Sequence, residues 1–452
     1  MRFIARFAKE QEECFEIITV YDVRTIKEKI NKLTPTLVSI AKEYPSATWF
    51  ERKITDDFGI EILYSTDKRP LVKHEHFPKD IYPMKKSFEK LTMESNSEKI
   101  EKSTGSHGII LGPTHPYHLE SSQFQLFEGN SEILHFETMP FYKYRAIEKM
   151  VEGMSLEDAK PIVERISGTN TVAYQLGYLD IWRQASKRTL PKTINVQHMF
   201  FLELERVLNH INDMALMCRF INFLEGSHFF MKLLEEGRET MKNLSGHRFG
   251  FGVVNLTNES EIKVENGFDF LNHLEKELIW FEKWMKVKPS FWKELVREGV
   301  ILKEDVKAFG LVGLVARSVA IDLDCRKDSL FYNEYGFVSA SENMGDTSSR
   351  FKIRLTEIHT SLRMMRKVLD NRVLPFFLGT TKDGEYTSFI ESSAGELMMY
   401  LELKDEKINR FFIRDPSFLN AQILSRCMKN NEMDALGVIL KSIPLSFSAN
   451  DL

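Results

Sequence analysis

One long stretch, from Thr193 to about Leu244, constrains the fold more than any other part of the chain. Its apolar residues recur at helical spacing and fall on one stripe, which is the pattern of a helix packed against a larger core. Ser260 to Lys303 is also amphipathic and aromatic-rich and predicts another pair of helices. We therefore expect the larger part of the chain to be mainly helical. The first stripe consists of Leu204, Val207, Leu208, Ile211, Ala215, Cys218 and Ile221.

The charge balance and the hydropathy pattern exclude several classes of function. The chain holds 61 basic and 65 acidic residues, so its net charge of −4 gives no reason to expect nucleic acid as a partner. No window approaches the roughly 18 apolar residues of a membrane span. The N-terminal stretch is too short and too interrupted by charge for a signal peptide. We therefore expect a cytoplasmic protein that would reach a membrane only through partners.

The cysteines give no sign of a disulfide framework or of a cluster held by this chain. Cys14, Cys218, Cys325 and Cys427 stand far apart and form no Cys-x-x-Cys pair. Iron–sulfur clusters usually need several clustered thiolates, and disulfides are not expected without a secretory signal. We predict buried or idle thiols in a reducing compartment.

Residues 1–86 predict a small α+β domain. Helical spacing of apolar residues predicts a helix from Tyr21 to Tyr44. The apolar run Ala47–Phe50 and the alternating segment Gly59–Tyr64 predict strands. Together these elements indicate a mixed unit distinct from the helical part.

The next boundary is marked by composition. Residues 87–107 are polar and charged, so they bury too little apolar surface to order by themselves and are interpreted as a linker. The second domain then spans residues 108–452. Alternation and turn residues from Ile109 to Glu137 predict a small sheet or hairpin at its start.

A charge cluster of Glu51, Arg52 and Asp57 lies on a short predicted helix in the first domain. Its simplest interpretation is a solvated helix face. The same residues match the Glu-Arg-Glu-x-x-Asp-x-Phe-Gly signature of the 30 kDa-type subunit of respiratory complex I, and the segments beginning at Arg69 and Lys73 resemble its continuation. The resemblance implies a docking domain that holds neighbouring subunits and carries no cofactor.

From Gly112 onward the sequence resembles the large subunit of group 4 membrane-bound nickel–iron hydrogenases and the 49 kDa-type quinone-site subunit of complex I. The motifs that carry this resemblance keep the family order along the chain. They are Gly112-Pro-Thr-His-Pro116, Tyr144-Arg-Ala-Ile-Glu-Lys149, Arg165-Ile-Ser-Gly-Thr-Asn170, Glu391-Ser-Ser-Ala-Gly-Glu396 and Ser446-Phe-Ser-Ala-Asn-Asp451. The resemblance implies a hydrogenase-large-subunit-like domain, mainly α, behind the docking domain.

Two of these motifs carry the metal-binding cysteine pairs in the hydrogenases. Here the corresponding positions are Ser167, Asn170, Ser446 and Ala449, and the arginine that overhangs the metal is Ala394. A nickel–iron centre requires soft, deprotonated thiolates, which hydroxyl, amide and methyl groups cannot replace. The resemblance therefore implies that the fold is kept and the usual catalyst is lost.

In complex I the vacated cavity takes a quinone, and the resemblance implies a quinone as the candidate ligand here. The hairpin offers His115 and His118, but Gly168 occupies the position of the family's tyrosine, so Tyr174, Tyr144 and His115 are candidate substitutes. The commoner alternative for either histidine is a surface loop position. A different metal held by both histidines and nearby carboxylates is a weaker option, because the spacing suits a tetrahedral site poorly.

Arg145 and Glu148 match family residues that lie near the active cavity in positions suited to proton transfer. The alternative is an Arg–Glu pair at i,i+3 on one helix, which contributes about 0.2–0.5 kcal/mol. Arg206 and His210 are expected to form a buried polar network that fixes helix packing. The candidate catalytic residues are Glu148, Arg145, His115 and Tyr174, and the candidate ligand-binding residues are His115, His118, Tyr144, Ser167, Gly168, Asn170, Ser446 and Asp451.

Two hypotheses of function follow from the resemblance. In the first, the chain is a peripheral subunit of an energy-converting oxidoreductase complex on the inner face of the cell membrane. Its partners are an iron–sulfur small subunit, a ferredoxin-like iron–sulfur subunit and integral ion-translocating subunits, and the partner's cluster supplies electrons to a ligand in the cavity. In the second, it is a non-catalytic subunit that keeps the fold to hold its neighbours. Both hypotheses leave this chain without a metal of its own.

Overall fold

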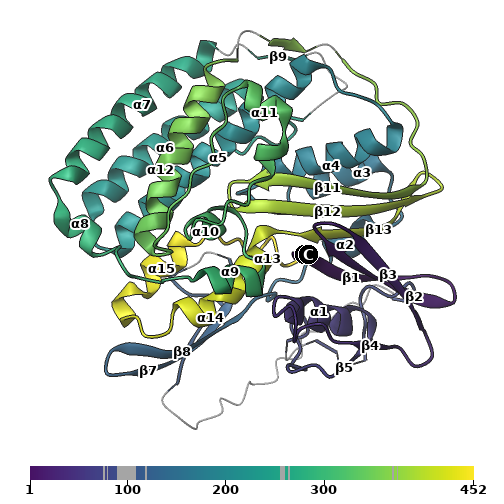
Figure 1. Ribbon diagram of the computed structural model, residues 1–452. Helices are drawn as coiled ribbons and strands as arrows, with labels where there is room; N and C mark the ends of the chain where they lie inside the picture. Colours follow the sequence, from purple (N-terminus) through teal and green to yellow (C-terminus); the bar gives the residue numbers. More distant parts are fainter. Residues whose placement is uncertain are drawn as a thin grey trace.

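A computed structural model describes residues 1–74, 77–78, 80–88, 108–117, 120–254, 260–262, 265–368, 371–373 and 375–452. A bundle of long helices lies beside a three-stranded sheet, and the N-terminal unit packs under that sheet (Figure 1). This arrangement confirms the expected α+β unit followed by a mainly helical part. Within the described ranges, no helix is long and apolar enough to cross a membrane.

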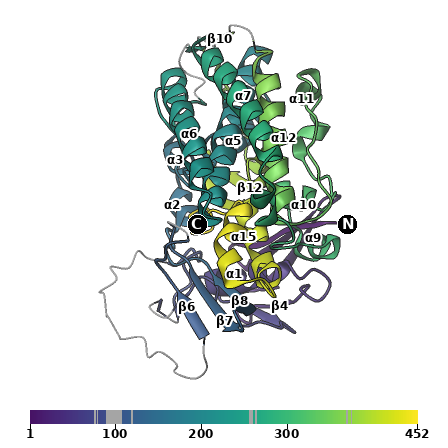
Figure 2. The same ribbon diagram turned by 90° about the vertical axis from the view of Figure 1, so that its left-hand side faces the viewer.

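The bundle is formed by α5 (Lys192–Phe220), α6 (Leu224–Ser245), α7 (Glu265–Lys286) and α12 (Thr347–Met365). These helices stand side by side in Figure 2, and α5 packs against both α6 and α12. The predicted apolar stripe of α5 faces the core, with Leu204, Val207 and Ile211 fully buried. The helix pair predicted from Ser260 is α7 followed by the short α8 (Pro289–Lys293).

The central sheet consists of β11 (Gly384–Ser392), β12 (Gly395–Lys404) and β13 (Lys407–Arg414), antiparallel and in that order. Helix α4 (Thr171–Ser186) packs on β11 and β12. Close approach depends on Gly177, since a Cβ atom there would meet the Met399 sulfur at 3.0 Å. The sheet therefore connects the bundle to the N-terminal unit.

The N-terminal unit differs from the sequence prediction between Tyr21 and Tyr44. Strands β1 (Phe3–Glu10), β2 (Cys14–Tyr21) and β3 (Thr25–Asn31) form an antiparallel sheet, and β4 (Thr36–Val38) pairs in parallel with β5 (Glu61–Leu63). The predicted helix is wrong. Apolar residues four apart also lie on one face of a strand, so the spacing was ambiguous and pairing with β2 decided it.

Helix α1 (Ala47–Phe58) corrects two further expectations. The run Ala47–Phe50 is the first turn of this helix and not a strand, because so short an apolar run fits either state. Glu51 and Asp57 are buried, so the solvated-face interpretation is also wrong. Glu51 accepts hydrogen bonds from Arg6 Nη1 at 2.7 Å and from the Ile40 backbone N–H at 2.8 Å. The predicted end at Gly59 is confirmed, since this residue caps α1 in the left-handed conformation.

The start of the second part is a small antiparallel sheet, as predicted, formed by β6 (Gly108–Leu111), β7 (Gln123–Gly129) and β8 (Glu132–Met139). Most of the predicted linker, residues 89–107, lies outside the described residues, as does His118. The remaining elements are α2 (Ile147–Val151), α3 (Leu156–Val163), β9 (Ser260–Ile262), α9 (Lys303–Phe309), α10 (Gly313–Arg317), η1 (Cys325–Asp328), α11 (Leu330–Glu334), β10 (Asn371–Val373), α13 (Pro416–Asn420), η2 (Ala421–Ile423), α14 (Leu424–Cys427), η3 (Met433–Ala435) and α15 (Leu436–Ser442).

Candidate functional site

Two turns that are far apart in the sequence meet between α4 and the end of the chain. The first turn, residues 167–170, precedes α4, and the second turn, residues 446–449, follows α15. The hydroxyl oxygens of Ser167 and Ser446 lie 2.9 Å apart and share a hydrogen bond, and both side chains are buried. The structure thus brings together the two predicted ligand positions of these turns.

A carboxylate that sequence reasoning missed closes the space beside the pair. Glu120 Oε1 accepts hydrogen bonds from Ser446 Oγ at 2.9 Å and from Ser448 Oγ, and Glu120 Oε2 accepts from the Phe447 backbone N–H. No local pattern around Glu120 marks this role. Only the meeting of the two turns reveals it.

The other members of the first turn bond to the hairpin between β11 and β12. Ser393 Oγ donates to Asn170 Oδ1 at 3.1 Å, and Asn209 Nδ2 donates to Ser393 Oγ at 2.8 Å and to the Thr169 carbonyl. Ala394, where the resemblance implies an arginine, is buried in the same hairpin. The hairpin therefore fixes the first turn through neutral hydrogen bonds.

The donor set at these positions does not fit a nickel–iron centre. Such a centre needs four thiolates, and the turns offer two hydroxyls, an amide and a methyl group. The hydroxyl of Ser446 is already bonded to Ser167 and to Glu120. Within the described ranges, no three side chains of His, Cys, Asp or Glu converge as a metal site. We derive no step through such a metal.

Arg145 connects the two turns. Its Nη2 donates to the Ile166 carbonyl at 2.7 Å and to the Ser448 carbonyl, and its Nε donates to the Asp451 carbonyl at 3.4 Å. It stands before α2 and points away from Glu148, so the predicted i,i+3 pair is not formed. Arg145 therefore holds the backbone of both turns in place through their carbonyl groups.

Asp451 is the titratable group of this region. The pKa of its carboxyl is raised to about 7: burial raises it most, the Arg145 guanidinium lowers it and the nearby Glu120 charge raises it. A carboxyl with that pKa exchanges a proton near neutral pH. The predicted ligand-binding residue Asp451 is therefore placed beside the second turn in a form suited to proton exchange.

Tyr174 is held away from any ligand. Its hydroxyl donates to Asp415 Oδ2 at 2.6 Å, and both residues are buried. Burial raises the pKa of Tyr174 well above its usual value, so the phenol stays neutral. Tyr174 is therefore a core residue, and its hydroxyl is not available to donate a hydrogen bond to a ligand.

His115 lies one layer behind the second turn. Its Nε2 is 3.2 Å from Ser122 Oγ, and its ring packs on Phe124, which contacts the ring of Phe447. The side chain is buried, and burial lowers its pKa. The surface-loop alternative for His115 is therefore wrong.

Glu148 belongs to a second group of charges, here called the seam cluster: Lys53 and Asp57 from α1, Glu148 from α2 and Arg410 from β13. Arg410 Nη2 lies 3.0 Å and Lys53 Nζ 3.7 Å from Glu148 Oε2, while Lys53 Nζ lies 2.6 Å from Asp57 Oδ2. The pKa of Asp57 is raised to about 6, because burial and the Glu148 charge raise it by more than Lys53 lowers it. The cluster joins the N-terminal unit to the sheet.

Tyr144 lies against the seam cluster. Its buried hydroxyl has no hydrogen-bond partner among the described residues. The buried oxygens Asp57 Oδ1 and Glu148 Oε1 also have none there. Burial, with the charges of Asp57 and Glu148, raises the pKa of Tyr144 well above its usual value. Of the predicted residues, Tyr144 and Glu148 therefore belong together, apart from the two turns.

A cavity of about 220 Å³ adjoins the first turn. Glu205, one of its lining residues, is buried and accepts hydrogen bonds from the backbone N–H groups of Val172 at 2.6 Å and Ala173 at 3.2 Å. Burial raises the pKa of Glu205 to about 8 although these bonds oppose the rise. The other lining residues are Glu120, Gly168, Thr169, Leu208, Asn209, Asn212, Leu234, Arg238, Met241, Arg248 and Phe249.

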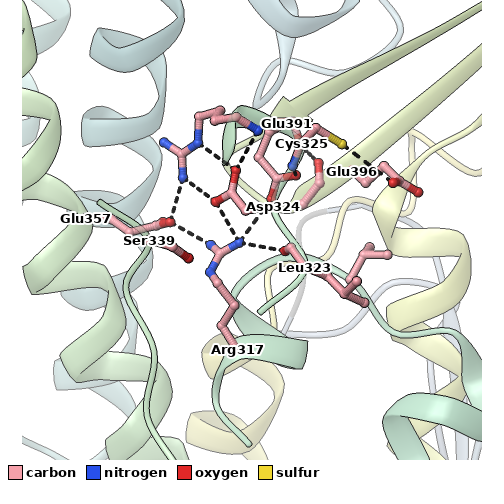
Figure 3. A network of polar contacts seen from close by, with 12 residues as sticks. Arg317, Leu323, Asp324, Cys325, Ser339, Glu357, Glu391 and Glu396 are labelled. Atoms are coloured by element: carbon pink, nitrogen blue, oxygen red, sulfur yellow. Dashed lines mark hydrogen bonds and ion pairs between the residues drawn. The ribbon is translucent and has the colours of Figure 1, made fainter. Parts of the chain in front are cut away.

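The predicted polar network around Arg206 and His210 is confirmed. His210 Nε2 lies 2.6 Å from Glu357 Oε2. Figure 3 shows the contact of Glu357 with Arg317, whose Nη2 lies 2.6 Å from Glu357 Oε1. The guanidinium of Arg206 donates to the carbonyls of Glu391 and Ser392. These contacts connect α5, α10, α12 and the end of β11, which holds the hairpin over the first turn.

Two families match separate parts of the chain. Residues 5–94 match the family described as the 30 kDa subunit of respiratory-chain NADH dehydrogenase, and residues 230–375 match the family described as its 49 kDa subunit.

Relatives over most of the chain carry related names. Formate hydrogenlyase subunit 5 of Escherichia coli (strain K12) is 23% identical over 94% of this chain and 79% of its own length. Hydrogenase-4 component G of the same organism is 24% identical over 91% of this chain and 75% of its own length. A subunit of the NADH-quinone oxidoreductase of Clostridium beijerinckii is 23% identical over 69% of this chain and 88% of its own length.

Proposed function

Because the chain is a fused homologue of the 30 kDa and 49 kDa subunits of respiratory-chain NADH dehydrogenase and of formate hydrogenlyase subunit 5, we propose that it is a peripheral subunit of a membrane-bound oxidoreductase complex. Its relatives are named as subunits or components, which supports a role inside an assembly. The proposed partners are an iron–sulfur small subunit, a ferredoxin-like iron–sulfur subunit and integral ion-translocating subunits.

The observation that carries the proposal further is the hydroxyl pair of Ser167 and Ser446, 2.9 Å apart. It stands where the resemblance implies thiolates, so the chain works without a nickel–iron centre. The cavity beside the first turn is then the place for an acceptor. Electrons come from the cluster of a partner subunit.

We propose a quinone-type acceptor for this cavity. The side chains of Asn209, Asn212 and Arg238 line it and can donate hydrogen bonds to carbonyl oxygens. A bound quinone supplies a site for two electrons and two protons. Asp451, with its pKa raised to about 7 near Glu120, is the chain's own group suited to hand over a proton.

One observation favours the alternative of a non-catalytic assembly subunit. The carboxylate of Glu120 already occupies the space beside the second turn and accepts bonds from Ser446, Phe447 and Ser448. A turn closed in this way needs no ligand to be stable. The fold would then serve to hold neighbouring subunits.

The first experiment is the nickel and iron content of the native complex, normalised to this chain. We expect iron without stoichiometric nickel. One nickel per chain would overturn the assignment of Ser167, Asn170, Ser446 and Ala449.

A variant separates the two functions. Arg238→Gln should lower electron transfer to a quinone analogue about tenfold or more with unchanged subunit stoichiometry, because it replaces the charged guanidinium of the cavity wall by a shorter, neutral amide. Lys242→Gln, one turn further along α6 and exposed, is the control. Equal turnover in both variants would favour the assembly role.

A further inference from the structure

Helix α7 presents an outward stripe in which lysines alternate with apolar side chains. Ile279, Trp280 and Val287 are 43%, 52% and 75% exposed, and the lysines between and beside them are exposed too. Six side chains spaced by three or four residues lie on one face of a helix. The lysine–apolar stripe consists of Lys276, Ile279, Trp280, Lys283 and Lys286 of α7 and of Val287, which directly follows the helix. It extends for about 16 Å along the helix axis.

The side of α7 that packs into the core is a different face from this stripe. Leu271, Leu274, Leu278 and Phe281 are fully buried on the opposite side. Apolar residues therefore stand on both faces, and those of the stripe are left open to solvent. Large exposed apolar side chains gathered with one sign of charge mark an interaction surface.

Helix α7 also carries Asp269 and Glu277 near this face, while two further carboxylates beside the stripe are engaged in ion pairs. Glu275 Oε2 lies 2.7 Å from Arg366 Nη1, and Glu282 Oε1 lies 2.7 Å from His359 Nε2. Every charged residue of the stripe is a lysine, although the whole chain has a net charge of −4. The positive charge is thus concentrated in the C-terminal half of α7, from Lys276 onward.

Aromatic rings extend the surface beyond the stripe. Trp280 lies 5.1 Å from the ring of Trp284, and Lys288 Nζ lies 4.6 Å above that ring. Leu224, at the start of α6, is 53% exposed. Helix α7 forms the outer edge of the bundle in Figure 1, away from the two turns and the N-terminal unit.

We propose that the lysine–apolar stripe lies on the anionic headgroup layer of a membrane. Lysine is depleted from the centres of protein–protein interfaces, whereas tryptophan beside lysine is typical of helices that lie on a membrane surface. The apolar side chains enter the boundary of the acyl chains and the lysines meet lipid phosphates. The chain itself thus contacts the membrane, in addition to any attachment through partners and whatever the cavity binds.

The test uses the full chain and vesicles of phosphatidylcholine with or without 30% phosphatidylglycerol (roughly the anionic content that gives a marked surface potential). We expect co-sedimentation with anionic vesicles only, and its loss at high salt. Replacing Lys276, Lys283 and Lys286 by Gln should weaken partitioning roughly 100-fold, because each lysine near such a surface contributes about fivefold. Trp280→Ser should also weaken it.

Three exposed lysines at one edge of the central sheet provide the matched control when they are replaced by Gln: Lys382 just before β11, Lys404 in β12 and Lys407 in β13. This variant should bind like the unmodified chain. If the unmodified chain does not sediment with anionic vesicles, the proposal is wrong, and the stripe then faces a protein partner or water. Equal losses in the two triple variants also overturn it, since net charge and not the stripe would then set binding.

Discussion

The hydroxyls of Ser167 and Ser446 show how a pair of neutral groups brings two distant turns into contact. Each hydroxyl can donate one hydrogen bond and accept others, so the pair adapts to its neighbours. Glu120 then fixes the second turn from one side, and Asn170 fixes the first through Ser393. At this scale the site is a closed set of hydrogen bonds.

Ser446→Ala should therefore destabilise the fold. The change removes a donor to Glu120 and leaves Ser167 without that partner, at a cost of about 1–3 kcal/mol. Denaturant unfolding measures the difference. Ser425→Ala, an exposed serine of α14, is the control and should change stability little. An unchanged midpoint for Ser446→Ala would mean that the pair contributes nothing net.

Glu148→Gln should lower turnover of the intact complex about tenfold, since the amide cannot carry a proton. The amide oxygen still accepts a bond from Arg410, so assembly should persist. Turnover and subunit stoichiometry are measured together, with exposed Glu157→Gln as control. Full turnover, or a complex that fails to assemble, contradicts a proton-transfer role of Glu148.

Glu205 gives a prediction of pH dependence. Its pKa is 4.5 in an ordinary setting and about 8 in the folded chain, so between these values the folded state holds a proton that the unfolded state has released. Stability of the unmodified chain should fall as pH rises through this window, by up to about 1.4 kcal/mol per unit. Glu205→Gln should remove that slope. Parallel stability–pH curves for the two proteins would contradict the raised pKa.

At the scale of elements, buried ion pairs connect helices and loops that are far apart in the sequence. Arg317 ends α10, Glu357 lies in α12 and Asp324 precedes η1, and all three are buried. Arg317 Nη1 lies 3.0 Å from Asp324 Oδ2 (Figure 3). The guanidiniums lower the pKa of Asp324 and hold that of Glu357 well below its usual range, so both stay ionised.

Arg317→Met should cost about 3–5 kcal/mol, because it leaves buried carboxylates without their counter-charge. Lys327→Met, which breaks the exposed pair with Asp322, should stay within about 1 kcal/mol. Thermal unfolding compares the two. Equal shifts would show that the Arg317 network is no more stabilising than a surface pair.

At the scale of the whole molecule, the N-terminal unit shares its core with the central sheet. The rings of Phe7 and Phe412 stack at 4.1 Å, and Lys9 Nζ lies 2.8 Å from Glu402 Oε1 and 2.9 Å from Glu385 Oε1. Arg2 adds an ion pair with Glu396 at 2.6 Å. The N-terminal unit and the central sheet therefore meet in a packed interface, and the seam cluster lies inside it.

Expressed as separate pieces, residues 1–88 and 108–452 should copurify in equal amounts, because the interface does not depend on the covalent connection. Phe7→Ser should separate them, since it removes a ring from the shared core. Val23→Ser, at a position that is 73% exposed, is the control. Size-exclusion chromatography shows whether the two pieces elute together. Pieces that elute apart without any substitution would contradict the shared core.

The sequence predicted the long helices and the small β6–β8 sheet because their patterns are long or alternate clearly. It failed between Tyr21 and Tyr44, where the spacing of Ile26 and Ile30 fits a helix or a strand equally well. The motifs predicted that the two turns would meet, as Ser167 and Ser446 do. Glu120 could not be predicted, because its role depends on contacts with residues more than 300 positions away.

The closure of the second turn by Glu120 limits what one substitution can change there. A mutation that placed a thiol at residue 446 would set a sulfur against a carboxylate that also binds Phe447 and Ser448. That thiol would not be free to bind a metal unless Glu120 moved, and the turn would then lose what fixes it. A metal ligand at this turn therefore requires changes at residues 120 and 446 together.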